Sequence, residues 1–347
     1  MNYGTVSNSL FYNNKAESGG AINWYADEGN VFSCLFVNNT ATTNGSIYHN
    51  DYELFSHSNF TNNILLNNGP EEIYYFIFEG SNTDYNWFGN NGSNYNQKPY
   101  NNSNTWLFIN GTANPDIIKV SDISEIIFKL YSYYGNEIAE YDDSLLYPFN
   151  LSLSSTKGTI SKDTIGLNEE ITFQAEDTGI ATVSGKIENV QSDITIRITD
   201  GTSFLDLNKT INDNNDTEIT LDKNYTFNPE MDSDFINGII INRQVRINGN
   251  SNTINGLDIA RIFHITGDNV ILNNISFTNG NASGNATADQ YGGAIEWDDA
   301  NGTVSNSTFN NNTANYGGAI QSYNENGNII NSTFNSNKAN SNGGAIY

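Results

Sequence analysis

The chain has 347 residues and a formal net charge of −25, with 14 basic and 39 acidic side chains. So few Lys and Arg residues exclude an extensive nucleic-acid surface and disfavour binding to anionic membranes. Asn and Gly, with 62 and 30 residues, make up more than a quarter of the sequence, but a hydrophobic content of 37% argues against disorder. The composition indicates a fold with very frequent turns, because Asn and Gly tolerate left-handed backbone conformations.

Residues with metal or redox chemistry are few and scattered. Cys34 is the single cysteine, so no internal disulfide can form. The three histidines, His49, His57 and His264, lie far apart along the sequence. No run of about 18 apolar residues predicts a membrane-spanning segment. We therefore expect no metal site, no cofactor and no membrane span in this chain.

Both ends of the chain carry a repeat. The segment GTVSNSLFYNNKAESGGAI (4–22) returns as GTVSNSTFNNNTANYGGAI (302–320) and as GNIINSTFNSNKANSNGGAI (327–346). The GGAI tetrads that begin at 292, 317 and 343 give a period of 25 or 26 residues. This period suits one coil of a right-handed parallel β-helix, in which coils stack at the strand spacing of ~4.8 Å. A leucine-rich horseshoe is disfavoured, because these repeats contain too little Leu.

Equivalent residues of successive coils should stack in columns. The spacing of the phenylalanines predicts two aromatic columns, one of Phe11, Phe36 and Phe60 and one of Phe277, Phe309 and Phe334. The Ala-Ile pair of GGAI should form an aliphatic column, and its two glycines a tight corner. An amide ladder is expected three residues before each Phe, at Asn8, Asn274, Asn306 and Asn331. Cys34 aligns with Ser9, Ser307 and Ser332, which predicts a small filler in that column.

Three segments are expected along the chain, all of them β. Residues 1–112 should be the C-terminal part of one parallel β-helix. Residues 113–200 should form an Ig-like β-sandwich spacer. Residues 201–347 should form the N-terminal cap and first coils of a second β-helix. The fold class is therefore all-β, with right-handed, pectin lyase-like β-helix segments flanking a sandwich.

The middle segment, residues 113–200, has a hydrophobic period of two residues and lacks the 25-residue repeat. Apolar and polar residues alternate at 126–131, 149–154, 171–174 and 194–198, and Asn becomes rare. Such strands at turn-separated intervals indicate a β-sandwich. It lacks the Cys–Trp–Cys pattern of antibody domains and resembles the bacterial Ig-like spacer class.

The ends of the two β-helices need covers. Trp87 and Trp106 are expected to cover the last coil of the first β-helix, where an open strand edge would invite aggregation. The alternative is that these tryptophans stack on carbohydrate. Phe204, Leu207 and Ile211 share one face of a predicted short helix that closes the second β-helix. The insertion at 279–290 should form a loop.

The GGAI and FxNN motifs resemble the repeats of the polymorphic outer-membrane protein family. The wider arrangement looks like the adhesin-like surface proteins of methanogenic archaea. This resemblance implies secretion, display on the cell surface and, by analogy, adhesion. A signal peptide and an anchor are expected outside this fragment.

Enzymatic chemistry is the competing interpretation, because many β-helices are polysaccharide lyases or hydrolases. A lyase needs a basic residue beside Ca²⁺-binding carboxylates, and a hydrolase needs paired carboxylates. The second β-helix offers only Arg243, Arg246, Arg261, Lys338 and the pair Asp298–Asp299. We expect Glu296, Asp298 and Asp299 to form a solvated turn. The sequence therefore predicts no catalytic, cofactor-binding or metal-binding residues.

The resulting hypothesis is a non-enzymatic, extracellular adhesin-like protein. Its expected partners are glycans or proteins on the surface or wall of other cells. The alternatives are a purely structural surface stalk and, less favoured, a polysaccharide lyase or hydrolase.

Overall fold

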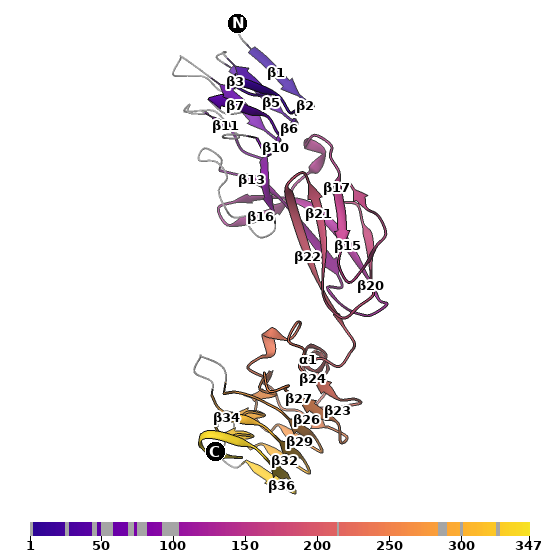
Figure 1. The fold of residues 1–347 in the computed structure, drawn as a ribbon, viewed down its shortest axis with the longest axis vertical. Helices are drawn as coiled ribbons and strands as arrows, with labels where there is room; N and C mark the ends of the chain where they lie inside the picture. The colour runs from indigo at the N-terminus through magenta and orange to yellow at the C-terminus, as the bar shows by residue number, and fades with distance from the viewer. Residues whose placement is uncertain are drawn as a thin grey trace. The chain divides into compact units, whose positions relative to one another are not determined.

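The structure is a computed structural model that describes residues 3–24, 28–43, 47–49, 58–68, 73–74, 82–91, 104–213, 215–283, 290–298, 301–323 and 327–347. It contains two compact units, Met1–Asp177 with Ala181–Ile198 and Thr178–Ile180 with Thr199–Tyr347 (Figure 1). We call them unit 1 and unit 2. Across the described ranges no helix combines the length and apolar character needed to cross a membrane.

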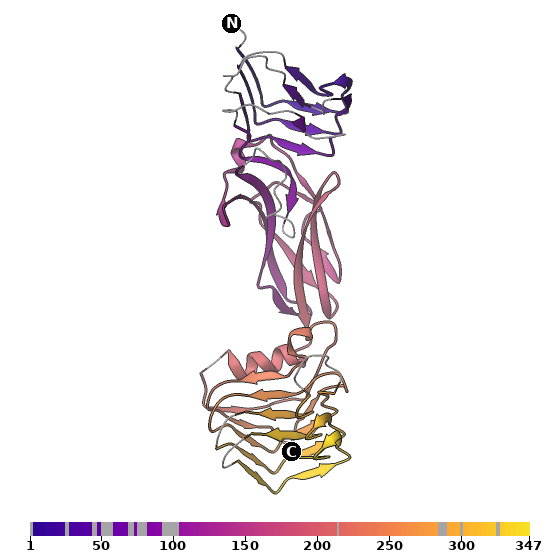
Figure 2. The same cartoon turned by 90° about the vertical axis from the view of Figure 1, so that its left-hand side faces the viewer.

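Unit 2 is a parallel β-solenoid, as the repeat predicts. Its described residues form three long parallel sheets, in the orders β23-β26-β29-β32-β36, β24-β27-β30-β33-β37 and β25-β28-β31-β35, and the parallel pair β34 (Thr313–Tyr316) and β38 (Lys338–Asn342). Figure 2 shows the strands of successive coils lying one above another. The first sheet comprises β23 (Glu218–Thr220), β26 (Arg246–Asn248), β29 (Ile271–Asn273), β32 (Thr303–Ser305) and β36 (Asn328–Ile330). The second comprises β24 (Tyr225–Thr226), β27 (Thr253–Asn255), β30 (Ser276–Thr278), β33 (Thr308–Asn310) and β37 (Thr333–Asn335). The third comprises β25 (Ile239–Ile241), β28 (Phe263–Ile265), β31 (Ile295–Trp297) and β35 (Ile320–Ser322).

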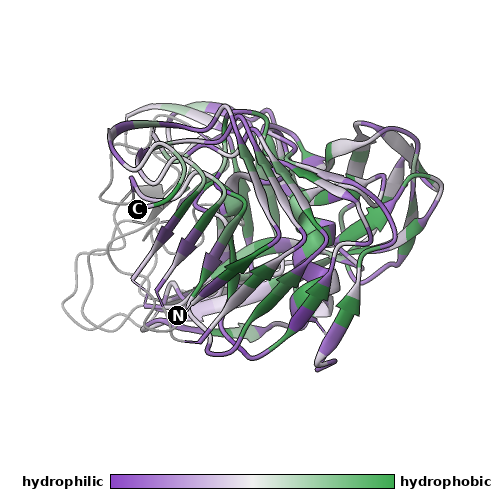
Figure 3. Ribbon diagram, turned by 90° about the horizontal axis from the view of Figure 1, so that it is seen from below, coloured by the Kyte–Doolittle hydropathy of each residue, from purple (hydrophilic) through white to green (hydrophobic). Residues whose placement is uncertain are grey.

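The core of unit 2 contains the predicted columns. Phe309 stacks on Phe277 at a ring-centroid distance of 4.7 Å and on Phe334 at 4.8 Å. Ile295 pairs in register with Ile320, which continues the aliphatic column. Gly292 has φ +54°, a left-handed value that a side chain would strain, so the first glycine of GGAI makes the corner. The strands alternate between hydrophobic and hydrophilic residues (Figure 3), and the inward set builds this core.

Helix α1 (Phe204–Asn212) closes the first coil of unit 2, as its apolar face predicts. It begins with a capping box, in which the Ser203 side chain accepts from the Asp206 backbone N–H and the Asp206 carboxylate accepts from the Ser203 backbone N–H. The buried carboxylate of Asp232 also accepts from the backbone N–H groups of Phe204 and Leu205, at 2.9 and 3.0 Å. Burial nevertheless raises the pKa of Asp232. The helix packs Phe204, Leu207 and Ile211 into the solenoid core.

Unit 1 begins with a second stretch of β-solenoid. Its parallel sheets are β1-β5-β9, β2-β6-β10-β12-β13 and β4-β8-β11, with the pair β3-β7. The strands are β1 (Tyr3–Ser7), β2 (Leu10–Tyr12), β3 (Lys15–Ser18), β4 (Ile22–Trp24), β5 (Glu28–Phe32), β6 (Leu35–Val37), β7 (Thr40–Thr43), β8 (Ile47–His49), β9 (Asn59–Thr61), β10 (Ile64–Leu66), β11 (Ile73–Tyr74), β12 (Asn86–Asn91) and β13 (Trp106–Asn114).

The aromatic column of unit 1 differs from its prediction at Phe60. Phe11 and Phe36 stack as expected, 4.6 Å apart and nearly parallel. Phe60, however, pairs in register with Val31, and Leu65 takes the place next to Phe36. The Phe60 ring still lies 6.0 Å from the Phe36 ring, tilted by 39°, but its predicted register was wrong because it assumed a constant period. The third coil starts later, so a 24-residue spacing of phenylalanines joins two different columns.

The amide ladder also lies elsewhere than predicted. Asn8, Asn274, Asn306 and Asn331 occupy left-handed turns with φ between 46° and 56°. The buried ladder forms three residues after the Phe, where Asn312 donates to the side-chain oxygen of Asn337 at 2.9 Å. In unit 1, Asn39 donates in the same way to Asn68. Buried amides satisfy the backbone groups of the bend there, and the exposed turn positions only need a residue that tolerates positive φ.

Strand β13 joins the first solenoid to two packed sheets. It runs parallel to β12 on one side and antiparallel to β15 (Ile123–Tyr134) on the other. The predicted boundary at 112/113 thus falls within β13, and the division of the chain into domains stays a prediction. One packed sheet continues through β15 to β20 (Ile171–Ala175) and β18 (Gly158–Ile160), with β16 (Glu137–Glu140) beside β15. The facing sheet has the order β14 (Ile117–Lys119), β22 (Val190–Thr199), β21 (Gly179–Ile187), β17 (Leu151–Ser155) and β19 (Thr164–Ile165).

The inner faces of these two sheets share one hydrophobic cluster, which includes Phe128, Phe173, Val183 and Ile196. Trp87 is fully buried and stacks on Phe149 at 5.5 Å. Trp106 is 6% exposed and lies against Tyr133. Both tryptophans therefore bury their rings where the solenoid meets the packed sheets, and neither presents a free face to a sugar.

Cys34 is buried as a small residue between coils. Its sulfur lies 3.3 Å from the carbonyl oxygen of Phe32. Burial raises the pKa of the thiol, which keeps it protonated and unreactive. This agrees with the predicted filler role.

Candidate functional site

The outer face of the sheet β25-β28-β31-β35 in unit 2 carries an unusual column of side chains. Register pairs place Ile240 beside His264, His264 beside Glu296, and Glu296 beside Gln321. Successive residues of a strand point to opposite faces of the sheet. The residues before and after these four are mostly part of the hydrophobic core, so the four side chains point outward. Glu296 and Gln321 are nonetheless only 5% and 1% exposed. Other groups must therefore cover them.

Glu296 forms a buried ion pair with Arg261. The guanidinium Nη1 lies 2.6 Å from the Glu296 carboxylate oxygen Oε2. Arg261 also donates to the backbone carbonyls of Tyr291, Gly292 and Asn237 at 2.9–3.2 Å. A buried guanidinium requires such partners, because burying an unpaired charge costs several kcal/mol. The prediction that Glu296 belongs to a solvated turn was wrong, since it lies within β31 and is buried.

His264 and Asp298 complete a polar cluster with Glu296. The imidazole Nε2 lies 2.8 Å from the Asp298 Oδ2 and 4.0 Å from the Glu296 Oε2. One ligand atom from each of the three residues lies within 4.8 Å of the others. Asp298 follows β31 directly and is partly exposed, which leaves the cluster accessible from that side. Asp299 lies outside the described residues.

Tyrosines gather beside this cluster. Tyr291 lies 5.3 Å from Tyr316 and 6.1 Å from Tyr323 between ring centroids, and Tyr316 lies 5.3 Å from Tyr347. Burial, then a hydrogen bond with Tyr291 and the negative charges of Glu296 and Asp298, raise the pKa of Tyr323. Tyr323 and Tyr347 are 60% and 50% exposed, so both present ring surface and a hydroxyl group to a ligand.

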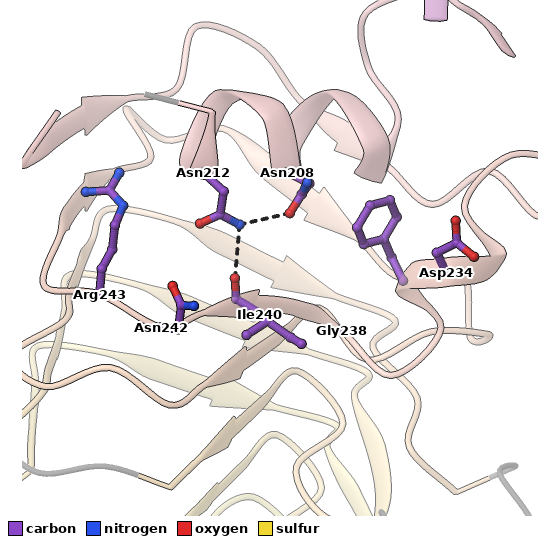
Figure 4. Close-up of a pocket in the computed structure, with 8 residues that line it drawn as sticks. Asn208, Asn212, Asp234, Gly238, Ile240, Asn242 and Arg243 are labelled. Carbon is purple, nitrogen blue, oxygen red and sulfur yellow. Dashed lines mark hydrogen bonds between the residues drawn. The ribbon is translucent and has the colours of Figure 1, made fainter. Parts of the chain in front are cut away.

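A pocket of about 440 Å³ lies at the start of the same column, between α1 and the first coil. Figure 4 shows Asn208 and Asn212 on α1 facing Ile240 of β25 and the residues Asn242 and Arg243 that follow this strand. The Asn212 amide donates to the Asn208 side chain at 2.8 Å and to the Ile240 carbonyl at 3.0 Å.

Two further groups complete the wall of this pocket. Arg243 donates to the carbonyl of Ile211 at 2.7 Å, near the C-terminal end of α1, where a cation is favourable. Phe235 adds an aromatic ring and Asp234 a carboxylate. Planar amides, a carboxylate, a cation and one aromatic ring are groups that can hydrogen-bond and stack on a polar ligand.

None of these residues was predicted as a site, although the sequence held a signal. Aligning the segments FHI, IEW and IQS by their place in the repeat puts His264, Glu296 and Gln321 in one column. Stacked residues of this column lie 25 to 32 positions apart, so neither Glu296 nor Gln321 is near His264 in the sequence. Among the basic residues weighed from the sequence, Arg261 joins the cluster. Arg243 lines the pocket, and Arg246 and Lys338 lie in β26 and β38 (Lys338–Asn342).

No family model, curated protein or solved structure matches this chain.

Proposed function

We propose that the protein is a non-enzymatic, cell-surface adhesin-like protein that attaches to glycans or proteins of other cells. The observation that carries this proposal is the outer face of β25-β28-β31-β35, where an amide-lined pocket, a polar column and exposed tyrosines follow one another. Hydroxyl-rich ligands suit such a face, since amides and carboxylates bond to hydroxyl groups and rings pack on sugar C–H surfaces.

The parallel solenoid and the GGAI and FxNN repeats support this function by resemblance to adhesin-like surface proteins. On the same basis we infer that the packed sheets of unit 1 are an Ig-like spacer and that the protein acts outside the cell. A solenoid repeats similar polar groups from coil to coil, so many weak contacts can add up through avidity.

Binding to glycans tests the proposal directly. A soluble monomer should bind weakly, with Kd on the order of 10⁻⁵ to 10⁻³ M, and display on beads should strengthen attachment ~100-fold. Tyr323→Ala and Asn212→Ala should each weaken bead attachment about tenfold, the equivalent of ~1.4 kcal/mol. Tyr12→Ala is the matched control, because Tyr12 is 51% exposed but belongs to unit 1.

Beads that retain no cells or glycans above an albumin control would leave a purely structural stalk as the function. The paired carboxylates of Glu296 and Asp298 are the observation that favours a polysaccharide hydrolase instead. Release of reducing sugars from polyuronate or wall polysaccharide, abolished by Asp298→Asn, would replace the adhesin proposal with that enzyme.

A further inference from the structure

The cluster of His264, Glu296 and Asp298 has the composition of a transition-metal site. It offers one imidazole nitrogen and two carboxylates, and imidazole ligands select Zn²⁺, Cu²⁺ or Ni²⁺ over Mg²⁺ and Ca²⁺. Two carboxylates against the single guanidinium of Arg261 leave an excess negative charge when the imidazole is neutral. That charge favours a cation at this point of the surface.

The spacing of the ligand atoms also suits a metal. Zn–ligand bonds of ~2.0–2.2 Å at tetrahedral angles place ligand atoms roughly 3.3–3.6 Å apart. The observed separations are 2.8 Å from the His264 Nε2 to Asp298 and 4.0 Å to Glu296, on either side of that range. Small rotations of the Asp298 and Glu296 side chains would bring all three atoms to bonding distance.

An independent observation comes from Gln321. Its side chain is 1% exposed, and its amide oxygen Oε1 has no hydrogen-bond partner among the residues that the structure describes. It extends from β35 on the same face as Glu296, its register neighbour. Buried amide oxygens are normally satisfied, so this acceptor points to a further donor or cation at the cluster.

The surroundings hold the ligands in place. His264 and Glu296 lie on adjacent strands of one sheet. Arg261 pairs with the Glu296 carboxylate and is itself held by three backbone carbonyls. Such outer partners orient ligands and reduce the cost of ordering them. We propose that His264, Glu296 and Asp298 bind a divalent transition-metal ion such as Zn²⁺, with the Gln321 amide oxygen next to it.

Calorimetric titration of the chelator-treated full chain with ZnCl₂ tests this site. We expect one ion per chain with Kd on the order of 10⁻⁶ M, and no binding of MgCl₂ at the same concentrations. His264→Gln and Asp298→Asn should weaken Zn²⁺ binding at least tenfold, because loss of a group that only orients a metal ligand already costs about 10–100-fold. His49→Gln is the matched control, since it removes a histidine of unit 1, and it should bind like the unchanged chain.

A second readout needs no variant. The chain has three histidines, so ¹⁵N spectra of the imidazoles should show one ring responding to Zn²⁺ and two unchanged. Equal binding by His264→Gln, a response of all three rings, or no response at all would overturn the proposal. The two proposals can fail separately, because the titration reads Zn²⁺ at His264, Glu296 and Asp298, whereas bead attachment is tested at Tyr323 and Asn212, which are not ligands of the ion.

Discussion

The guanidinium of Arg261 lies 2.6 Å from the carboxylate of Glu296, and both side chains are buried although Glu296 points to the outer face of a solenoid sheet. Most outward positions of such a sheet face solvent. Here Arg261 takes the place of solvent around the Glu296 carboxylate. The position of this carboxylate is therefore fixed, as it would not be in an exposed turn.

Removing one member of that pair should destabilise unit 2. Glu296→Ala leaves Arg261 buried without its counter-charge, and we expect the free energy of unfolding to fall by ~3–5 kcal/mol. The double change of Arg261→Met with Glu296→Leu should recover most of this loss. Hydrogen exchange of the backbone amides of unit 2 measures the change in the free energy of unfolding in both variants. The exposed pair Lys129–Glu140 is the control, and Glu140→Gln should leave exchange unchanged.

The phenylalanine column makes a prediction about packing. Phe309 is fully buried between two stacked rings. Phe309→Ala should cost ~3–5 kcal/mol, because it removes buried surface and leaves a cavity. Phe32, 37% exposed, is the matched control. Urea unfolding that shows the same midpoint for both variants would contradict the stacked core.

The buried amide ladder should be sensitive to shape-conserving changes. Asn312 accepts from the Gly280 backbone N–H at 2.8 Å and donates to Asn337 at 2.9 Å. Asn312→Leu leaves these partners unsatisfied, at an expected cost of at least ~2 kcal/mol in thermal or urea unfolding. Asn331→Asp is the comparison, because Asn331 lies in an exposed left-handed turn that Asp also tolerates. A smaller effect at Asn312 than at Asn331 would argue against the ladder.

Tyr141 predicts a pH dependence for unit 1. Its hydroxyl donates to the Asn62 side chain at 2.6 Å, and burial, with the nearby Tyr85 and Asp142, raises the pKa of Tyr141 from 10.0 to about 12. The folded state therefore retains a proton that the unfolded state loses above pH 10. The stability from Tyr141 is complete below pH 10 and is lost as the pH rises to 12, by ~2.7 kcal/mol for two pKa units.

Unfolding of Tyr141→Phe and of the unchanged chain at pH 8 and pH 11.5 checks this sign. The variant should lose less stability between the two values. Tyr134→Phe serves as the control, because Tyr134 is 58% exposed in the fold, and it should follow the unchanged chain. The same loss in all three proteins would remove Tyr141 as the cause.

Sequence periodicity predicts the solenoid well where the repeats are regular. Phe277, Phe309 and Phe334 stack as their spacing requires, and α1 forms where Phe204, Leu207 and Ile211 share a face. Periodicity gives the wrong register for Phe60, because the length of a coil depends on its turns and not on its strand residues.

The cluster around Glu296 could not be predicted from composition. A Glu followed by two Asp residues is typical of a solvated turn, and only the register with His264 and the reach of Arg261 bury it. Residues that are neighbours on adjacent coils lie more than 20 positions apart in the sequence. The charges close to a residue in the sequence therefore do not indicate which residues it contacts in the fold.

Strand β13 has a mechanical consequence for unit 1. Because it pairs with β12 on one side and with β15 on the other, tension applied to the solenoid passes into the packed sheets through a ladder of backbone hydrogen bonds. Rupture on the β15 side, where nine residue pairs are in register, would require many bonds to shear together, whereas a single-chain linker would simply straighten. A protein that holds cells together against flow would benefit from a joint that resists pulling in this way.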